Sequence, residues 1–136
     1  MESLNPRELY SRKKLTVLSN ETFLVFLGHS DCRVSEIEQL CNAKGEPMLF
    51  YVQRKLDVPG TPDRKTWRSL GHVMKVSSDD LDLIEGAYKA EKSPTEILLA
   101  KFKTFTPEPT MREFVQALII CQRNDVASYI CNWQWE

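Results

Sequence analysis

The sequence has no apolar run that approaches the roughly 20 residues of a membrane-spanning helix. Its start, Met1-Glu2-Ser3-Leu4, lacks the basic and apolar regions of a secretory leader. With 18 basic residues, 19 acidic residues and a formal net charge of -1, the chain carries no large excess of either sign. We therefore expect a cytoplasmic protein with no direct membrane binding and no general affinity for nucleic acid.

Phosphate-binding loops and catalytic groups are also scarce. The five glycines, at positions 28, 45, 60, 71 and 86, form neither G-x-G-x-x-G nor the Walker pattern, so we expect no nucleotide site. The only histidines are His29 and His72, and no feature places either beside a nucleophilic cysteine. We expect no catalytic residue, no cofactor and no enzyme activity.

The four cysteines lie at wide spacings, without any C-x-x-C pair. Cys121 and Cys131 fall on apolar faces of predicted helices, where a cysteine is usually a small buried hydrophobe. We therefore expect free thiols and no metal site. The alternative is a small metal- or thiol-dependent regulatory enzyme that uses His29, Cys32 and Cys41, although their spacing fits no familiar zinc motif.

Helix start signals follow one another in the second half of the chain. Ser93-Pro94-Thr95-Glu96 combines an N-cap serine, a proline at the first helical position and a glutamate three residues after the cap. The spacing Thr110-x-x-Glu113 repeats the capping box, and Asn124-Asp125 begins a last helix. Two short amphipathic units, residues 67–74 and 77–85, come before them. The segment therefore predicts five short helices.

The apolar positions of these helices resemble the death-domain family. The pattern runs Trp67-x-x-Leu70, Leu81-x-x-Ile84, Ser93-Pro94-Thr95-Glu96-x-Leu98-Leu99, Thr110-x-x-x-Phe114-x-x-x-Leu118 and Arg123-x-Asp125-Val126. Its ending is similar to the death domains of ectodysplasin-receptor adaptors and of the nerve-growth-factor receptor. The resemblance implies an all-α fold, namely a six-helix antiparallel death-domain bundle over residues 45–136.

Residues 1–44 are predicted to form an N-terminal extension of short helices, a hairpin or both. Asn5-Pro6-Arg7-Glu8 predicts a short helix to about residue 14. The apolar runs at residues 15–18 and 23–27 fit a hairpin or two short strands as well as a helix, because periodicity cannot separate these cases over so short a length. Residues 35–43 are predicted to form another helix, which Gly45 stops.

Thirteen apolar side chains at helical spacings are predicted to form the core of the domain. They are Leu49, Val52, Leu56, Trp67, Leu70, Leu81, Ile84, Leu98, Phe102, Phe114, Leu118, Val126 and Ile130. Two prolines and a glycine make residues 59–63 a loop. Near the C-terminus, Trp133 and Trp135 are predicted either to fold back on the domain or to anchor an interface.

Charge is segregated along the chain. Between Arg54 and Arg68 five basic residues stand against two acids, a local net charge of +3, and between Asp79 and Glu85 four acids stand alone, a net of -4. The predicted protein-interaction residues are Arg54, Lys55, Arg64, Lys65, Arg68, Asp79, Asp80, Asp82 and Glu85. The alternative is that these are ordinary solvated faces, with acids that stabilise a helix start.

The resemblance implies a cytosolic signalling module that binds other death-domain proteins. Its contacts would be homotypic, with itself or with an adaptor, receptor or kinase in an immune or apoptotic signalling complex. Asymmetric contacts between unlike patches, which the resemblance implies, would join copies into a higher-order assembly.

Overall fold

The structure is a computed structural model that describes residues 20–58, 65–88, 90–133 and 135. Its α-helices are α2 (Asn20–His29), α3 (Met48–Leu56), α4 (Trp67–Val73), α5 (Ser78–Glu85), α6 (Pro94–Phe102), α7 (Met111–Ile120) and α8 (Asn124–Cys131). Two 3-10 helices, η1 (Val34–Glu38) and η2 (Gly86–Tyr88), complete the elements. The described residues contain no β-strand, so the predicted all-α fold, with six bundle helices α3 to α8, is confirmed.

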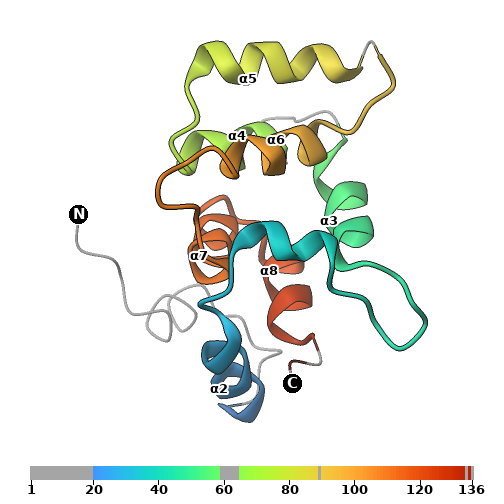
Figure 1. Cartoon of the computed structure of the whole chain (residues 1–136), viewed down its shortest axis with the longest axis vertical. Coiled ribbons are helices and arrows are strands. Elements are labelled where there is room, and N and C mark those ends of the chain that lie inside the picture. The colour runs from blue at the N-terminus through green and yellow to red at the C-terminus, as the bar shows by residue number, and fades with distance from the viewer. Residues whose placement is uncertain (1–19, 59–64, 89, 134, 136) are drawn as a thin grey trace.

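The helices stack from one end of the molecule to the other. Figure 1 shows α5 at one end, α4 and α6 beneath it, and α2 at the opposite end. Helices α7 and α8, which the figure shows in the middle, pack against each other. Within the described part of the chain, this arrangement leaves one side of α5 without a neighbouring helix.

Side-chain caps begin helices α6 and α7 at the predicted positions. The Ser93 hydroxyl accepts a hydrogen bond from the backbone amide of Glu96 at 3.1 Å, and Pro94 lies in the first turn. Thr110 and Glu113 form a reciprocal capping box, in which each side chain accepts from the backbone amide of the other. These bonds satisfy amides that have no partner within the helix, which explains why the two helices begin where they do.

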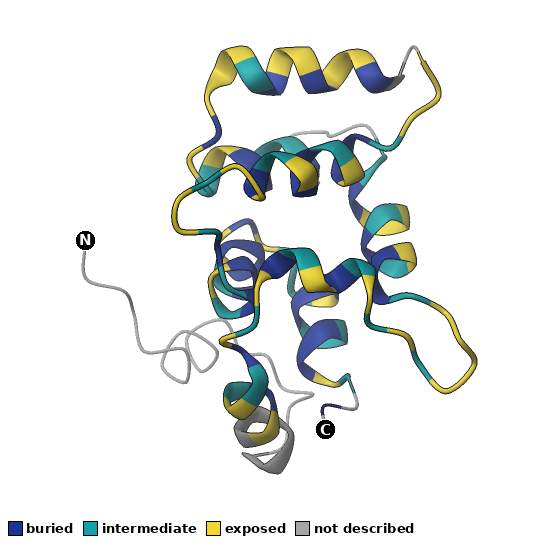
Figure 2. Ribbon diagram, viewed as in Figure 1, coloured by how far each residue is buried: buried dark blue, intermediate teal, exposed yellow. Residues whose placement is uncertain are grey.

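All thirteen predicted core residues are buried, and Trp67, at 1% exposure, is the largest of them. In Figure 2 the buried residues of each helix lie on the side that faces its neighbours. The core also takes in fully buried side chains that we did not predict: Phe26, Val34, Ile37, Met48, Leu99, Met111, Val115 and Ile119. Burial of apolar surface on this scale is the main favourable contribution to folding.

The N-terminal extension differs from the prediction in part. Residues 23–27 lie within α2, so the helical alternative for this run is correct and the strand alternative is wrong. The predicted helix at residues 35–43 is wrong beyond Glu38, because the chain turns back there. The Asn42 side chain accepts from the amides of Lys44 and Glu46, and Gly45 has a positive φ of 79°, which favours glycine. The segments predicted at residues 5–18 and 59–63 lie outside the described residues.

The described part of the extension shares the hydrophobic core of the bundle. Val34 donates a backbone hydrogen bond to the Pro109 carbonyl at 2.9 Å, and Met111 donates one to the Cys32 carbonyl at 2.9 Å. Val34 and Ile37 of η1 are fully buried. Packing therefore continues across residue 44. The division of the chain into an extension and a domain at this residue stays a prediction.

The C-terminal tryptophans also reach the bundle. Trp135 is 8% exposed, and its indole nitrogen donates to the Ile130 carbonyl at 2.9 Å. Its ring lies edge-on to Phe26 at 5.9 Å and stacks with His29 at 6.0 Å between ring centroids. Of the two alternatives for Trp135, folding back is the one observed. Trp133 is partly buried against the same core.

Candidate protein-interaction surface

The predicted basic residues do not form one surface. Arg54 and Lys55 lie in the last turn of α3, and Lys65 lies two residues before α4. These three side chains line a cavity of about 490 Å³, here called the basic cavity. Its other lining residues are Val58, Cys121, Gln122, Arg123 and Asp125. Arg64 lies outside the described residues, and Arg68 belongs to a different cluster.

Arg123 builds the basic cavity. Its guanidinium makes a two-pronged contact with the Asp125 carboxylate, with Nε and Nη2 at 3.0 and 2.9 Å from the two oxygens. Its Nη1 donates to the backbone carbonyls of Lys55 at 3.1 Å and Lys65 at 2.7 Å. The side chain is only 11% exposed. One mostly buried arginine side chain therefore ties the end of α3, the segment before α4 and the first turn of α8 together.

The charges of the basic cavity shift the pKa values of two lining groups. Burial alone would raise the pKa of Asp125, but the hydrogen bonds and charge of Arg123 outweigh it and hold that pKa below its usual value. Burial raises the pKa of the Cys121 thiol to about 11, although Lys65 and Arg123 oppose the shift. At neutral pH Asp125 is therefore ionised and Cys121 is a neutral, unreactive thiol.

Arg68 pairs with the predicted acidic helix of its own molecule. Its Nη2 lies 2.6 Å from an Asp82 carboxylate oxygen, and its Nη1 lies 3.8 Å from a Glu85 oxygen. Asp80 pairs with Lys101 of α6 at 3.1 Å. Hydrogen bonds from Lys101 and Ser77 lower the pKa of Asp80. These contacts link α5 to α4 and α6, so part of the predicted acidic patch is compensated within the molecule.

The outer side of α5 keeps an acidic and apolar surface. Asp79, Asp82 and Leu83 stand at positions i, i+3 and i+4, so they share one face of the helix. Leu83 is 78% exposed, and the Asp82 side chain remains 65% exposed despite its pairing. Figure 2 shows exposed residues along the side of α5 that none of the described helices covers. Here we call Asp79, Asp82 and Leu83 the α5 face.

Two functional candidates were missed among the predicted interaction residues. Arg123 was noticed only as part of a family pattern, although the Arg-x-Asp spacing is a signal for a local ion pair. Leu83 was missed because it interrupts the acidic run without joining the predicted core. The signal for Leu83 is its helical position: it lies four residues after Asp79, on the acidic side of the helix and away from the apolar stripe of Leu81 and Ile84.

The alternative metal or thiol site draws no support from the geometry. The His29 ring is stacked on Trp135, the Cys32 thiol has a pKa raised by burial and by Glu36, and Cys41 is exposed. Within the described ranges no three His, Cys, Asp or Glu side chains gather closely enough to hold a metal ion. All four cysteines are free thiols, as predicted.

A second cavity, of about 420 Å³, lies on another part of the surface. Tyr129 and Trp133 supply its aromatic wall, and the turn at residues 41–43 supplies the opposite side. Tyr129 also stacks on Tyr51, with ring centroids 3.7 Å apart. None of the predicted interaction residues that the structure describes lines this cavity.

The ion pair in the basic cavity predicts a specific acid sensitivity. Because the folded-state pKa of Asp125 is lowered, its stabilising effect is complete above about pH 4 and is lost as the pH falls through the folded-state pKa. We expect Asp125→Asn to cost about 1 kcal/mol at pH 7, a figure reduced for its 46% exposure, and almost nothing at the acid end. Urea unfolding across pH 2–7 measures the difference, and a constant gap between the two proteins would contradict the assignment.

Comparison with known proteins assigns the fold to a family. Among the described residues, no helix is both long and apolar enough to cross a lipid bilayer. Neither a curated protein nor a solved structure matches the chain. A family model described as Death domain matches residues 53–134, which cover α4 to α8 and the end of α3. Since this match covers more than half of the 136-residue chain, the chain belongs to the death-domain family.

Proposed function

We propose that this death domain joins other death domains through an asymmetric contact between the α5 face of one molecule and the basic cavity of the next. The observation that carries the proposal is the separation of unlike charges on one molecule. Asp79 and Asp82 lie on α5, whereas Arg54, Lys55 and Lys65 lie at the end of α3 and before α4. Because the two surfaces differ, each copy can use both at once, and the contact generates chains or helical stacks.

An apolar anchor within a charged surface favours a real interface over two solvated faces. Leu83 is 78% exposed between acidic neighbours, and Val58 and Cys121 give the basic cavity an apolar component. A few residues that become fully buried at the centre of a contact provide most of its energy, while charged rims provide specificity and speed of association. The α5 face and the basic cavity have both parts.

Membership of the family supports a proposal about the biological setting. Death domains are protein–protein interaction modules of signalling proteins. We infer a cytoplasmic role in an immune or apoptotic complex, with a second copy or the death domain of an adaptor, receptor or kinase as partner. The receptor-like ending of the chain, Arg123-x-Asp125-Val126, favours a receptor or an adaptor.

Charge reversal tests the proposed contact. We expect Lys55→Glu/Lys65→Glu to weaken association at least about tenfold, because like charges then face each other at the interface. Asp79→Lys/Asp82→Lys should have the same effect. A mixture of the two variants should recover association, since their altered surfaces complement each other. Sedimentation velocity measures all three, at two salt concentrations, because screening should weaken the wild-type contact.

A matched control separates the two surfaces from net charge. Lys44→Glu/Lys92→Glu makes the same change in charge at two exposed lysines outside both surfaces. This variant should assemble as the wild type does. If the reversed variants also assemble like the wild type, the contact lies elsewhere, and the cavity beside Tyr129 and Trp133 becomes the next candidate.

A further inference from the structure

The basic cavity holds three cationic side chains that no described acid neutralises. Arg54, Lys55 and Lys65 make no ion pair with a described residue; the ammonium of Lys55 lies 5.5 Å from the centre of the Tyr51 ring. Asp125, the only acid among the described lining residues, is already held by both prongs of Arg123. Counted over the described residues, the cavity therefore carries an uncompensated positive charge in a chain whose formal net charge is -1.

The described acid nearest to Lys55 in sequence is also engaged elsewhere. Asp57 follows α3 directly, and one of its carboxylate oxygens accepts from the backbone amide of Thr95 at 2.8 Å. That bond caps the start of α6. Asp57 is consequently occupied with a helix end, and it is not one of the residues that line the basic cavity.

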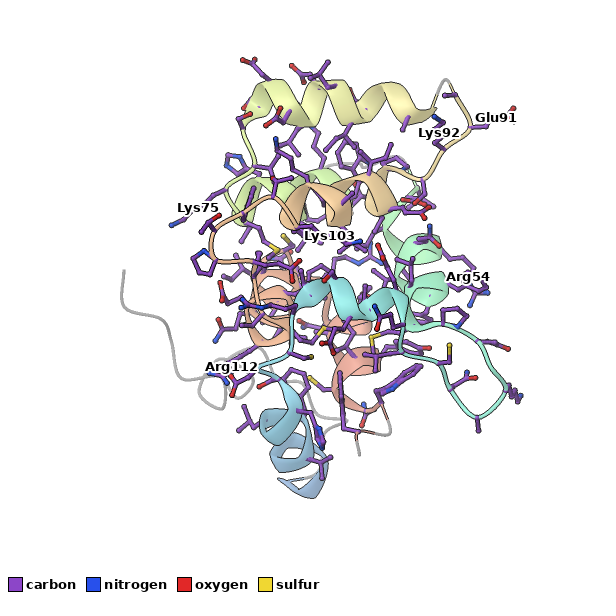
Figure 3. All side chains as sticks on the ribbon, viewed as in Figure 1. Arg54, Lys75, Glu91, Lys92, Lys103 and Arg112 are labelled. Carbon is purple, nitrogen blue, oxygen red and sulfur yellow. The ribbon has the colours of Figure 1, made fainter. Side chains whose placement is uncertain are left out.

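The backbones of Lys55 and Lys65 are held in place by Arg123. One nitrogen of Arg123, Nη1, donates hydrogen bonds to the backbone carbonyls of both Lys55 and Lys65. The two residues are ten positions apart in sequence, yet this nitrogen keeps their main chains side by side. Arg54, the neighbour of Lys55, projects from α3 in Figure 3. The cavity thus presents its charges from a framework that is formed before any ligand arrives.

The size and the field of the cavity suit a compact anion with some attached atoms. At about 490 Å³ the cavity falls in the size range of small-ligand sites, roughly 300–1,000 Å³. Lys65 and Arg123 oppose the effect of burial on the Cys121 thiol, so their positive field reaches this lining group. Val58 supplies an apolar contact for the part of a ligand to which an anionic group is attached.

We propose that the basic cavity binds a phosphate monoester group through Arg54, Lys55 and Lys65. A phosphate monoester carries a charge of about -1.5 to -2 at neutral pH and presents three acceptor oxygens, whereas a carboxylate carries one charge and two oxygens. Three cations around one cavity match the first better than the second. Binding does not require the proposed assembly, but the ligand would occupy the surface that meets the α5 face and would block that contact.

The proposal is tested by direct binding measurements. The protein used is the Asp79→Lys/Asp82→Lys variant, because it keeps the basic cavity and lacks the acidic partner surface. Calorimetry and amide chemical shifts would be measured with inorganic phosphate, with a phosphoserine peptide and with the same peptide carrying glutamate. We expect the phosphoserine peptide to bind at least about tenfold more tightly than the glutamate peptide. The shifts should centre on residues 54–58, 65 and 121–125.

Matched lysine variants locate the site. Lys55→Gln/Lys65→Gln should lose at least about tenfold in affinity for phosphate, whereas Lys44→Gln/Lys92→Gln should bind as before. Figure 3 places Lys92 beyond the end of α5, away from Arg54. Phosphoserine peptide binding that exceeds that of inorganic phosphate identifies a phosphorylated side chain as the source. Equal affinities show that the cavity recognises the phosphate group alone, whatever carries it, and both outcomes support the proposal.

Three results would overturn it. They are equal binding of the glutamate and phosphoserine peptides, an equal loss of affinity in the two lysine variants, and no response at millimolar ligand. None of them bears on the sedimentation of the wild type, so failure of the phosphate site and failure of the proposed assembly are distinguished by different measurements.

Discussion

Truncation of Trp67 to alanine is expected to lower the free energy of unfolding by about 3–5 kcal/mol. Trp67 is 1% exposed in the first turn of α4 and is the largest fully buried side chain among the described residues. Its removal leaves a void that the surrounding helices, fixed by their own contacts, can fill only in part. Because small domains are stable by about 5–15 kcal/mol, the loss approaches global unfolding.

Urea denaturation followed by circular dichroism measures this loss. Leu83→Ala is the matched control, since it truncates a large apolar side chain that is 78% exposed and should change stability by less than about 0.5 kcal/mol. If Trp67→Ala does not fold, Trp67→Phe retains part of the volume and should show a smaller but measurable loss. A loss below about 1 kcal/mol for Trp67→Ala would show that this side chain does not organise the core.

Replacement of Arg123 with alanine is expected to cost about 2–4 kcal/mol, the second largest effect. The substitution removes four hydrogen bonds and leaves two backbone carbonyls and the Asp125 carboxylate without their donor. The Arg123 side chain is only 11% exposed and donates four charge-assisted bonds, so the loss should exceed that of a surface ion pair.

Arg123→Lys separates geometry from charge. Lysine keeps the positive charge but cannot reach two carbonyls and a carboxylate at once, so we expect it to recover less than half of the loss. A double-mutant cycle with Asp125→Ala would isolate the ion pair from the two carbonyl contacts. If Arg123→Lys were as stable as the wild type, charge alone would account for the effect, and the proposed cross-link of α3, α4 and α8 would be wrong.

The helices of the bundle could be predicted because their start signals are local. Ser77, Ser93 and Thr110 each accept from the backbone amide three residues later, so every partner is written in the same short stretch of sequence. The core could be predicted for a related reason: apolar residues at helical spacing must face a neighbour, whichever neighbour that is.

The extension resisted prediction because its structure depends on distant residues. The apolar run at residues 23–27 carries no local preference strong enough to select helix over strand. Segment 30–34 takes its position from backbone bonds to Pro109, Met111 and Arg112, about 80 positions away. Asn42 and the bend at Gly45 then end the helical conformation sooner than the apolar spacing indicated.

The same division applies to the charged surface. The sequence alone determined which residues are charged, that the acids gather on one helix, and which family the domain resembles. Only the tertiary structure decided their partners: Arg68 meets Asp82 across 14 positions, and Arg123 reaches the carbonyls of Lys65 and Lys55 across 58 and 68 positions. Charge interactions act through space and decay with distance, so a chain's order says little about them until the helices have packed.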